Sequence, residues 1–201
     1  MIKTLIFDLG GVIVPLDFPS AYAAIGAISP HPAAEIRERI IATGLVDRLE
    51  LGQVAPEAFA REMSAALGLD LPYDRFCELW SGIFPPHTLV PDELLAELHG
   101  RYRLLLLSNT NAIHFTFVKQ RYPILRHFDD YVLSYDLGVM KPDAAIYEAA
   151  VAKADCRPEE CFFTDDSEVN VDGARRAGID AVQFLSVEKL REDLRARSIM
   201  S

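Results

Sequence analysis

The sequence predicts an α/β protein with a doubly wound parallel sheet and an inserted small helical cap. Three observations support this fold class. Short apolar runs typical of buried parallel strands recur along the chain, helical patterns separate the later runs, and about 70 residues after the first run are helical in pattern without a convincing strand. The strands are expected at residues 4–7, 104–107, 131–133, 161–164 and 181–184.

The first strand, residues 4–7, opens the chain and runs into Asp8, Gly10 and Gly11. A secretory signal peptide needs an uninterrupted apolar middle and a cleavage site with small residues, and the acid and the glycines break that pattern. We therefore expect a buried strand here and a cytoplasmic protein.

Residues 16–88 are expected to form the helical cap. The clearest helices span residues 33–41, 57–67 and 73–80, with Pro56 in the first turn of the second and Gly68 at its end. A loop of that length is improbable in a compact domain. The predicted division is therefore an α/β core of residues 1–15 and 89–201 and a cap of residues 16–88 between its two parts.

The remaining helices alternate with the later strands. They are expected at residues 91–98, 112–121, 144–153 and 169–177, and Gly100 and Gly178 follow two of them as stop signals. Residues 188–197 alternate charges, which is typical of a solvated amphipathic helix.

Composition excludes several classes of partner. The net charge is −10, from 30 acidic and 20 basic residues, and no cluster of lysine and arginine predicts a nucleic-acid-binding face. No apolar run is long enough to predict a transmembrane helix. Cys77, Cys156 and Cys161 lack metal-site spacing and are expected to be free thiols. We expect a small-molecule substrate and no nucleic acid or membrane partner, with a monomer and a homodimer both open.

Polar residues follow four of the predicted strands. Ligands of an open parallel sheet bind beyond the carboxyl ends of its strands, so these residues are expected to face one rim. The clusters are Asp8, Ser108 with Asn109 and Thr110, Lys141, and Asp165 with Asp166.

Three carboxylates on one rim predict a cation. Two unit charges about 4 Å apart repel by roughly 4 kcal/mol at an effective dielectric near 20, so Asp8, Asp165 and Asp166 would not all stay ionised unaided. Hard oxygen ligands suit Mg²⁺. With Lys141 and a serine hydroxyl nearby, the rim predicts a phosphate site in which one carboxylate acts as nucleophile.

The four clusters in this order resemble the haloacid dehalogenase (HAD) superfamily, from residue 1 to about residue 186. The resemblance is carried by FDLGGVIV, LLLSNT, GVMKPD and FFTDDSEVNVDGARRAG, and within the superfamily it is closest to bacterial α-D-glucose-1-phosphate phosphatase-like members. It implies that the α/β core is a HAD-like Rossmannoid core. It also implies a Mg²⁺-dependent phosphatase of small phosphomonoesters, with sugar phosphates as substrates. The paired Asp165 and Asp166 argue against dehalogenation, which uses no metal.

The resemblance also implies roles for individual residues. Asp8 is the implied nucleophile and would form an aspartyl-phosphate, Ser108 and the backbone N–H of Asn109 would bind the phosphoryl group, and Lys141 would neutralise it. The implied Mg²⁺ ligands are Asp8, the backbone carbonyl of Gly10, Asp166 and Asp165. Asn170 has two interpretations, a residue that supports these ligands or an exposed residue of the next helix.

The first motif departs from the family at Gly10, where the usual residue is the aspartate that serves as general acid and base. Such catalysis contributes typically about 10²–10⁴-fold, or roughly 3–5 kcal/mol of barrier. One interpretation is a substrate whose leaving group needs little help, such as an anomeric phosphate, or a substitute donor such as a cap-held water or Asp17. The alternative is a phosphate-binding or protein-interaction module with little or no catalysis.

Other residues are open to two interpretations. His114 could approach the rim, although a packing role is the simpler expectation for a lone histidine. Trp80 and Phe84 are expected in the core, with stacking on a substrate as the second interpretation. Arg48 and Glu50 fall in the middle of the cap, where residues normally select the substrate, but the sequence does not say which of them faces inward.

Overall fold

Five parallel strands form the sheet, in the order β3-β2-β1-β4-β5. The computed structural model describes residues 1–200. The strands are β1 Thr4–Phe7, β2 Arg103–Ser108, β3 Asp130–Leu133, β4 Cys161–Asp165 and β5 Asp180–Gln183. All five predicted strands are present, and the fold class is confirmed.

The register brings the carboxyl ends of the central strands together. Phe7, the last residue of β1, lies opposite Leu106 of β2 and Thr164 of β4. The N–H of Asp8 continues the ladder by donating to the Thr164 carbonyl at 3.0 Å. Residues just beyond β1, β2 and β4 therefore emerge at one edge of the sheet.

Helices cover both faces of the sheet, which explains why its strands are continuous apolar runs. One face packs against α6 Asp92–His99, α7 Ala112–Arg121 and α11 Val187–Ala196. The other face packs against α9 Ala144–Ala154 and α10 Glu168–Arg176. Successive residues of β1 alternate between them, with Leu5 and Phe7 on the first face and Ile6 on the second.

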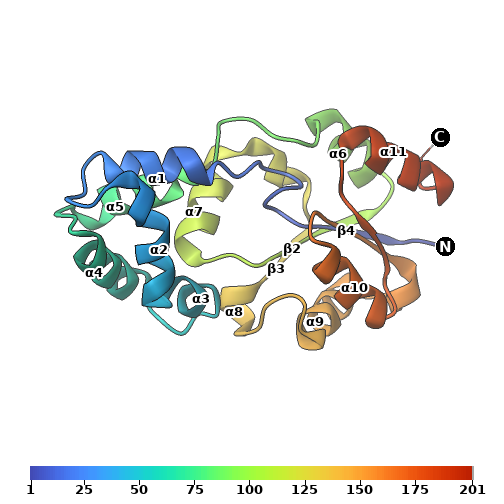
Figure 1. Cartoon of the computed structure of the whole chain (residues 1–201). Helices are drawn as coiled ribbons and strands as arrows, with labels where there is room; N and C mark the ends of the chain where they lie inside the picture. The colour runs from blue at the N-terminus through green and yellow to red at the C-terminus, as the bar shows by residue number, and fades with distance from the viewer. Residues whose placement is uncertain (201) are drawn as a thin grey trace.

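Five further helices gather beyond the carboxyl ends of the strands, on the left of Figure 1. These cap helices are α1 Phe18–Gly26, α2 Ala33–Thr43, α3 Leu45–Glu50, α4 Pro56–Leu67 and α5 Tyr73–Trp80. They pack around an apolar cluster of their own, to which α7 adds Ile113. The division at residues 15 and 89 stays a prediction, and we propose it on the basis of this separate cluster.

The sequence analysis missed three helices. α1 begins after Asp17, whose side chain caps it, and has Pro19 in its first turn. α3 has six residues and α8, Ser134–Leu137, has four, and neither is long enough to show a helical period. Short 3₁₀ turns complete the structure at η1 Ser81–Ile83, η2 Pro123–His127 and η3 Pro158–Glu160.

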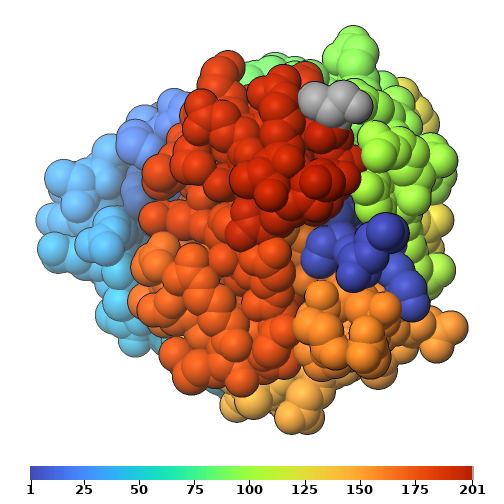
Figure 2. Space-filling view, turned by 90° about the vertical axis from the view of Figure 1, so that its right-hand side faces the viewer, coloured from blue at the N-terminus to red at the C-terminus, as the bar shows by residue number. Residues whose placement is uncertain are grey.

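The opposite end of the sheet is covered. Figure 2 looks at that end and shows the segments near the C-terminus and around α10 filling most of the surface, with the N-terminal residues emerging between them. In the described residues, no helix has the length and apolar character needed to cross a membrane. The carboxyl ends of the strands lie at the other end of the sheet, where the cap helices gather.

Replacement of Phe59 by alanine should test the core of the cap helices. Phe59 is fully buried, and its ring meets those of Trp80 and Phe76 at centroid distances of 5.0 and 6.0 Å. Deleting such a ring typically costs about 3–5 kcal/mol, and we expect that loss in the free energy of unfolding measured in urea. Ile28→Ala, at a side chain that is 53% exposed, should cost no more than about 0.5 kcal/mol. A loss at Phe59 as small as at Ile28 would contradict a packed cap core.

Candidate active site

Lys141 joins the ends of three strands. Its buried Nζ lies 2.8 Å from Asp8 Oδ1 and 2.6 Å from Asp165 Oδ2, and it donates to the Leu107 carbonyl at 3.1 Å. An ammonium has three donors, so these contacts satisfy it completely. Burial alone would lower the pKa of Lys141, but the charges of Asp8 and Asp165 raise it above its usual value. Lys141 is therefore a fixed positive charge.

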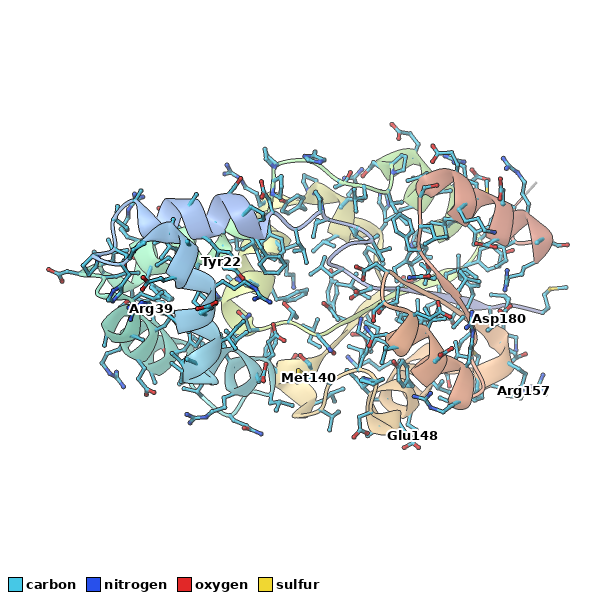
Figure 3. All side chains as sticks on the ribbon, viewed as in Figure 1. Tyr22, Arg39, Met140, Glu148, Arg157 and Asp180 are labelled. Atoms are coloured by element: carbon cyan, nitrogen blue, oxygen red, sulfur yellow. The ribbon has the colours of Figure 1, made fainter. Side chains whose placement is uncertain are left out.

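The Asn109 side chain holds the backbone of Lys141. Asn109 Nδ2 donates to the Lys141 carbonyl at 3.0 Å, and the Lys141 N–H donates to Asn109 Oδ1 at 2.8 Å. The next residue, Thr110, exchanges hydrogen bonds with the Ser134 hydroxyl at 3.0 and 2.9 Å. Figure 3 labels Met140, the neighbour of Lys141, beside α8. The loop after β2 therefore positions Lys141, a role the sequence analysis did not predict for the Asn109 side chain.

Asp165 is the structural member of the acidic pair. It is fully buried, and its Oδ1 accepts from the Ser167 N–H at 2.9 Å and from Asn170 Nδ2 at 3.0 Å. Oδ2 accepts from Lys141 and, at 3.2 Å, from the same Asn170 amide. Asn170 is thus a supporting residue, as the first of its two interpretations had it.

Asp8 and Asp166 are less completely paired. Asp8 Oδ1 accepts from the Leu9 N–H at 2.7 Å and contacts Lys141, whereas no hydrogen bond or ion pair within residues 1–200 uses Oδ2. Burial, partly offset by Lys141, raises the pKa of Asp8 to about 7. Partial burial and the charge of Asp165 also raise the pKa of Asp166. Both carboxylates would therefore gain from a nearby cation.

The three carboxylates fit a divalent cation. Ligand oxygens of Asp8, Asp165 and Asp166 lie within 4.8 Å of one another. Gly11 permits this approach, because its φ is +75° and a Cβ there would lie 2.5 Å from Asp166 Oδ2. An all-oxygen, carboxylate-rich set is what Mg²⁺ prefers. The sequence analysis did not single out Gly11, because the reason for a glycine at this position is its contact with Asp166, far along the chain.

Gly10 and Ser108 lie at the edge of the site. The turn after Asp8 is closed by bonds from the Gly11 N–H to the Val14 carbonyl and from the Val14 N–H to the Leu9 carbonyl, so the Gly10 carbonyl is not used there. A Cβ at Gly10 would point at Leu16, 3.0 Å from its Cδ1. Ser108 is buried at the end of β2, and its hydroxyl makes one long hydrogen bond of 3.4 Å to the Asn109 carbonyl.

A cavity of about 310 Å³ separates these residues from the cap helices. Its core wall includes Gly10, Ser108 and Asn109. Its cap wall is mostly apolar and includes Tyr22 of α1, labelled in Figure 3. Trp80 and Phe84 are both buried, as expected of core residues, and both also line the cavity.

His114 has the expected packing role, and it also lines the cavity beside the rim. It is buried, its ring stacks on Trp80 with centroids 5.9 Å apart, and Nε2 lies 3.2 Å from the Trp80 carbonyl. Nδ1 lies 3.1 Å from Asn111 Nδ2, so both ring nitrogens have partners. Burial lowers the pKa of His114 to about 4 and keeps the ring neutral.

Asp17 is a helix cap. Its carboxylate accepts from the Ser20 N–H at 3.0 Å at the start of α1, and this hydrogen bonding lowers its pKa. An acid with a lowered pKa is a poor proton donor near neutral pH. The structure therefore does not favour Asp17 as the substitute for the acid missing at Gly10.

Comparison with known proteins agrees with this geometry. The family model described as haloacid dehalogenase-like hydrolase matches residues 2–178. A D-ribitol-5-phosphate phosphatase from Bacteroides thetaiotaomicron is 28% identical over 96% of this chain and 97% of its own. A HAD family enzyme from the same organism, crystallised with magnesium and inorganic phosphate, is 30% identical over 91% of this chain and 94% of its own, with a TM-score of 0.81. A predicted HAD-like hydrolase from Porphyromonas gingivalis is 29% identical over 97% of this chain and 98% of its own, with a TM-score of 0.82.

The buried His114 predicts a pH-dependent difference in stability. Between pH 6.5 and about 4 the unfolded chain protonates this histidine and the folded chain does not, so its contribution to stability falls as the pH falls. Relative to His114→Gln, wild type should lose about 2 kcal/mol of unfolding free energy between pH 7 and 4.5, measured in urea, because each pKa unit corresponds to about 1.4 kcal/mol. Titration of the other acids is common to both proteins. Parallel pH profiles would show that His114 is not held neutral.

Proposed function

The chain belongs to the haloacid dehalogenase-like hydrolase family, and from this premise we propose that it is a Mg²⁺-dependent phosphatase acting on small phosphomonoesters. One observation carries the proposal. Asp8 is held by Lys141 through one carboxylate oxygen only, beside the carboxylate of Asp166. This arrangement provides a nucleophile, a fixed positive charge and a cation site at the carboxyl edge of a parallel sheet.

The proposed first step is attack by Asp8. Its Oδ2, which has no partner within residues 1–200, forms a bond to phosphorus while the bond from phosphorus to the leaving alcohol breaks, giving an aspartyl-phosphate. Lys141 orients the carboxylate through Oδ1 and offsets the negative charge of the phosphoryl group. Water then attacks phosphorus and releases phosphate from Asp8.

The neighbouring residues complete the proposed phosphate site. The Ser108 hydroxyl, which has one long hydrogen bond, and the Asn109 N–H would donate to the phosphoryl oxygens. The oxygens of Asp8, Asp166 and the Gly10 carbonyl would hold Mg²⁺ directly. Asp165, whose oxygens already accept from Lys141 and Asn170, would contribute through water. The chemistry that Mg²⁺ supplies when bound is neutralisation of the carboxylates and of the phosphoryl oxygens.

The proposed substrates are small sugar or polyol phosphates. The relative from B. thetaiotaomicron is named for D-ribitol 5-phosphate, and the cavity of about 310 Å³ beside Ser108 is at the small end of the range for ligand pockets. Ribitol 5-phosphate is the ester of a primary alcohol, a poorer leaving group than an anomeric hydroxyl. If this chain accepts such esters, the proton for the leaving group must come from somewhere other than Gly10.

Replacement of Asp8 by asparagine tests the proposed function. We expect wild type with Mg²⁺ to release phosphate from members of a panel of sugar 1-phosphates, terminal sugar and polyol phosphates and p-nitrophenyl phosphate. Asp8→Asn, or chelation of Mg²⁺, should reduce release by at least about 10³-fold, because an amide cannot form the acyl phosphate.

Asp17→Asn is the matched control for this prediction. It makes the same chemical change at a residue that caps α1, and asparagine is as good a cap as aspartate, so activity and stability should both be retained. Phosphate release that is absent in wild type, or unchanged in Asp8→Asn, would favour the phosphate-binding module that the glycine at position 10 also suggests.

A further inference from the structure

We propose that Glu50, the last residue of α3, is the general acid and base that serves the leaving group from the cap side of the cavity. The inference rests on the proposed phosphatase function and identifies a group that the first motif lacks. Three other candidates are excluded, since Gly10 has no side chain, Asp17 caps α1, and both ring nitrogens of His114 have partners.

Glu50 shares a cavity with the residues proposed to bind the phosphoryl group. It lines the same cavity as Gly10, Ser108 and Asn109, on the wall formed by the cap helices. Only one other acidic residue, Asp47, lines this cavity, and it is exposed to solvent, whereas Glu50 is half-buried. Within the described part of the chain, the Glu50 carboxylate makes no hydrogen bond or ion pair, so it is available to a bound molecule.

The backbone that follows Glu50 packs closely against α8. Gly52 has a φ of +66°, and a Cβ there would lie only 2.2 Å from the carbonyl oxygen of Tyr135 in α8. The turn is closed by hydrogen bonds from the Leu51 N–H to the Asp47 carbonyl and from the Gln53 N–H to the Arg48 carbonyl. Glu50 is therefore presented by a short, closed turn in direct contact with α8, and Figure 1 shows α3 and α8 side by side.

The same contacts connect Glu50 to the catalytic loop. Ser134, which precedes Tyr135, exchanges hydrogen bonds with Thr110, and Thr110 directly follows Ser108 and Asn109. A continuous set of contacts thus runs from the turn after Glu50 to the residues that position Lys141. A proton donor must keep a defined distance from the nucleophile, and this path supplies the required rigidity.

The protonation state of Glu50 suits both halves of the reaction. Burial, with a smaller contribution from Asp47, raises the pKa of Glu50 to about 7, while Lys141 acts in the opposite direction. The influence of Lys141 also indicates that Glu50 is within electrostatic reach of the catalytic centre. Near neutral pH the carboxyl and carboxylate forms are both populated, which is the condition for efficient acid and base catalysis.

The proposed proton transfers balance over the two steps. As Asp8 Oδ2 bonds to phosphorus and the ester bond breaks, the departing alkoxide takes the proton of Glu50 and leaves as the alcohol. Glu50, now a carboxylate, then accepts a proton from the water that attacks phosphorus, and Asp8 leaves as a carboxylate. The products are the alcohol and hydrogen phosphate, and Glu50 is protonated again.

Glu50→Gln separates proton transfer from other roles through the choice of leaving group. With Mg²⁺ present, kcat/KM for D-ribitol 5-phosphate, a primary alkyl ester, should fall by about 10²-fold or more, which is the usual size of general acid catalysis. The value for p-nitrophenyl phosphate, whose phenolate leaves unprotonated, should change by less than about 3-fold on the same reasoning. Lost base catalysis should appear as a burst of p-nitrophenolate equal to the enzyme concentration.

Two further variants complete the experiment. Glu50→Asp keeps a carboxyl on a shorter side chain and should recover part of the activity toward the alkyl ester. Glu62→Gln makes the same change as Glu50→Gln at an exposed residue of α4 outside the cavity and should leave both esters unaffected.

Each outcome has a distinct meaning. An equal loss on both esters in Glu50→Gln, or no loss on either, would overturn the role of Glu50 while leaving the phosphatase in place. If wild type releases phosphate from no member of the panel, the proposed function fails and this inference fails with it. Release from sugar 1-phosphates alone, whose leaving group needs little help, would overturn the role of Glu50 and leave the phosphatase in place. A selective loss on the alkyl ester, partly restored in Glu50→Asp, supports the proposal.

Discussion

The candidate site depends on one buried cation. Lys141 is almost inaccessible, and its ammonium is within hydrogen-bonding distance of Asp8, Asp165 and the Leu107 carbonyl. A charge buried without partners costs several kcal/mol, and removal of one member of such a group leaves the others uncompensated. The three groups therefore stabilise one another only when the ends of β1, β2 and β4 are in register.

The contacts of the two buried aspartates give them different roles. Asn170, the Ser167 N–H and Lys141 occupy both oxygens of Asp165, so it serves to hold Lys141. Asp8 is held through Oδ1 alone, which leaves its second oxygen without a partner in the described chain. Asp165 thus positions Lys141, whereas Asp8 is the candidate nucleophile. The difference arises because Asn170, in the helix after β4, donates its amide to Asp165 and not to Asp8.

The sequence predicts features that depend on local pattern and not those that depend on distant contacts. The five strands were predictable because burial on both faces makes them apolar runs. Asp8, Ser108, Lys141 and Asp165 could be proposed as site residues because each lies at the end of a strand or in the segment that leads away from one. By contrast, the bond of the Asn109 side chain to the Lys141 backbone joins residues 32 positions apart, and nothing local signals it. α3 is too short to show a period, so the inward direction of Glu50 could not be inferred from the sequence.

The geometry of Gly10 explains why a substitute acid would come from the cap. A side chain at position 10 would point toward Leu16, so an acid there would occupy the space that Leu16 now fills. The core wall of the cavity then offers hydroxyl, amide and backbone groups and the neutral ring of His114, whose two nitrogens already have partners. The opposite wall carries Glu50, and α3 is fixed to α8 by the close contact at Gly52. In such an arrangement the nucleophile and the proton donor belong to different parts of the chain, so proton transfer to the leaving group requires the cap helices to be seated against the sheet.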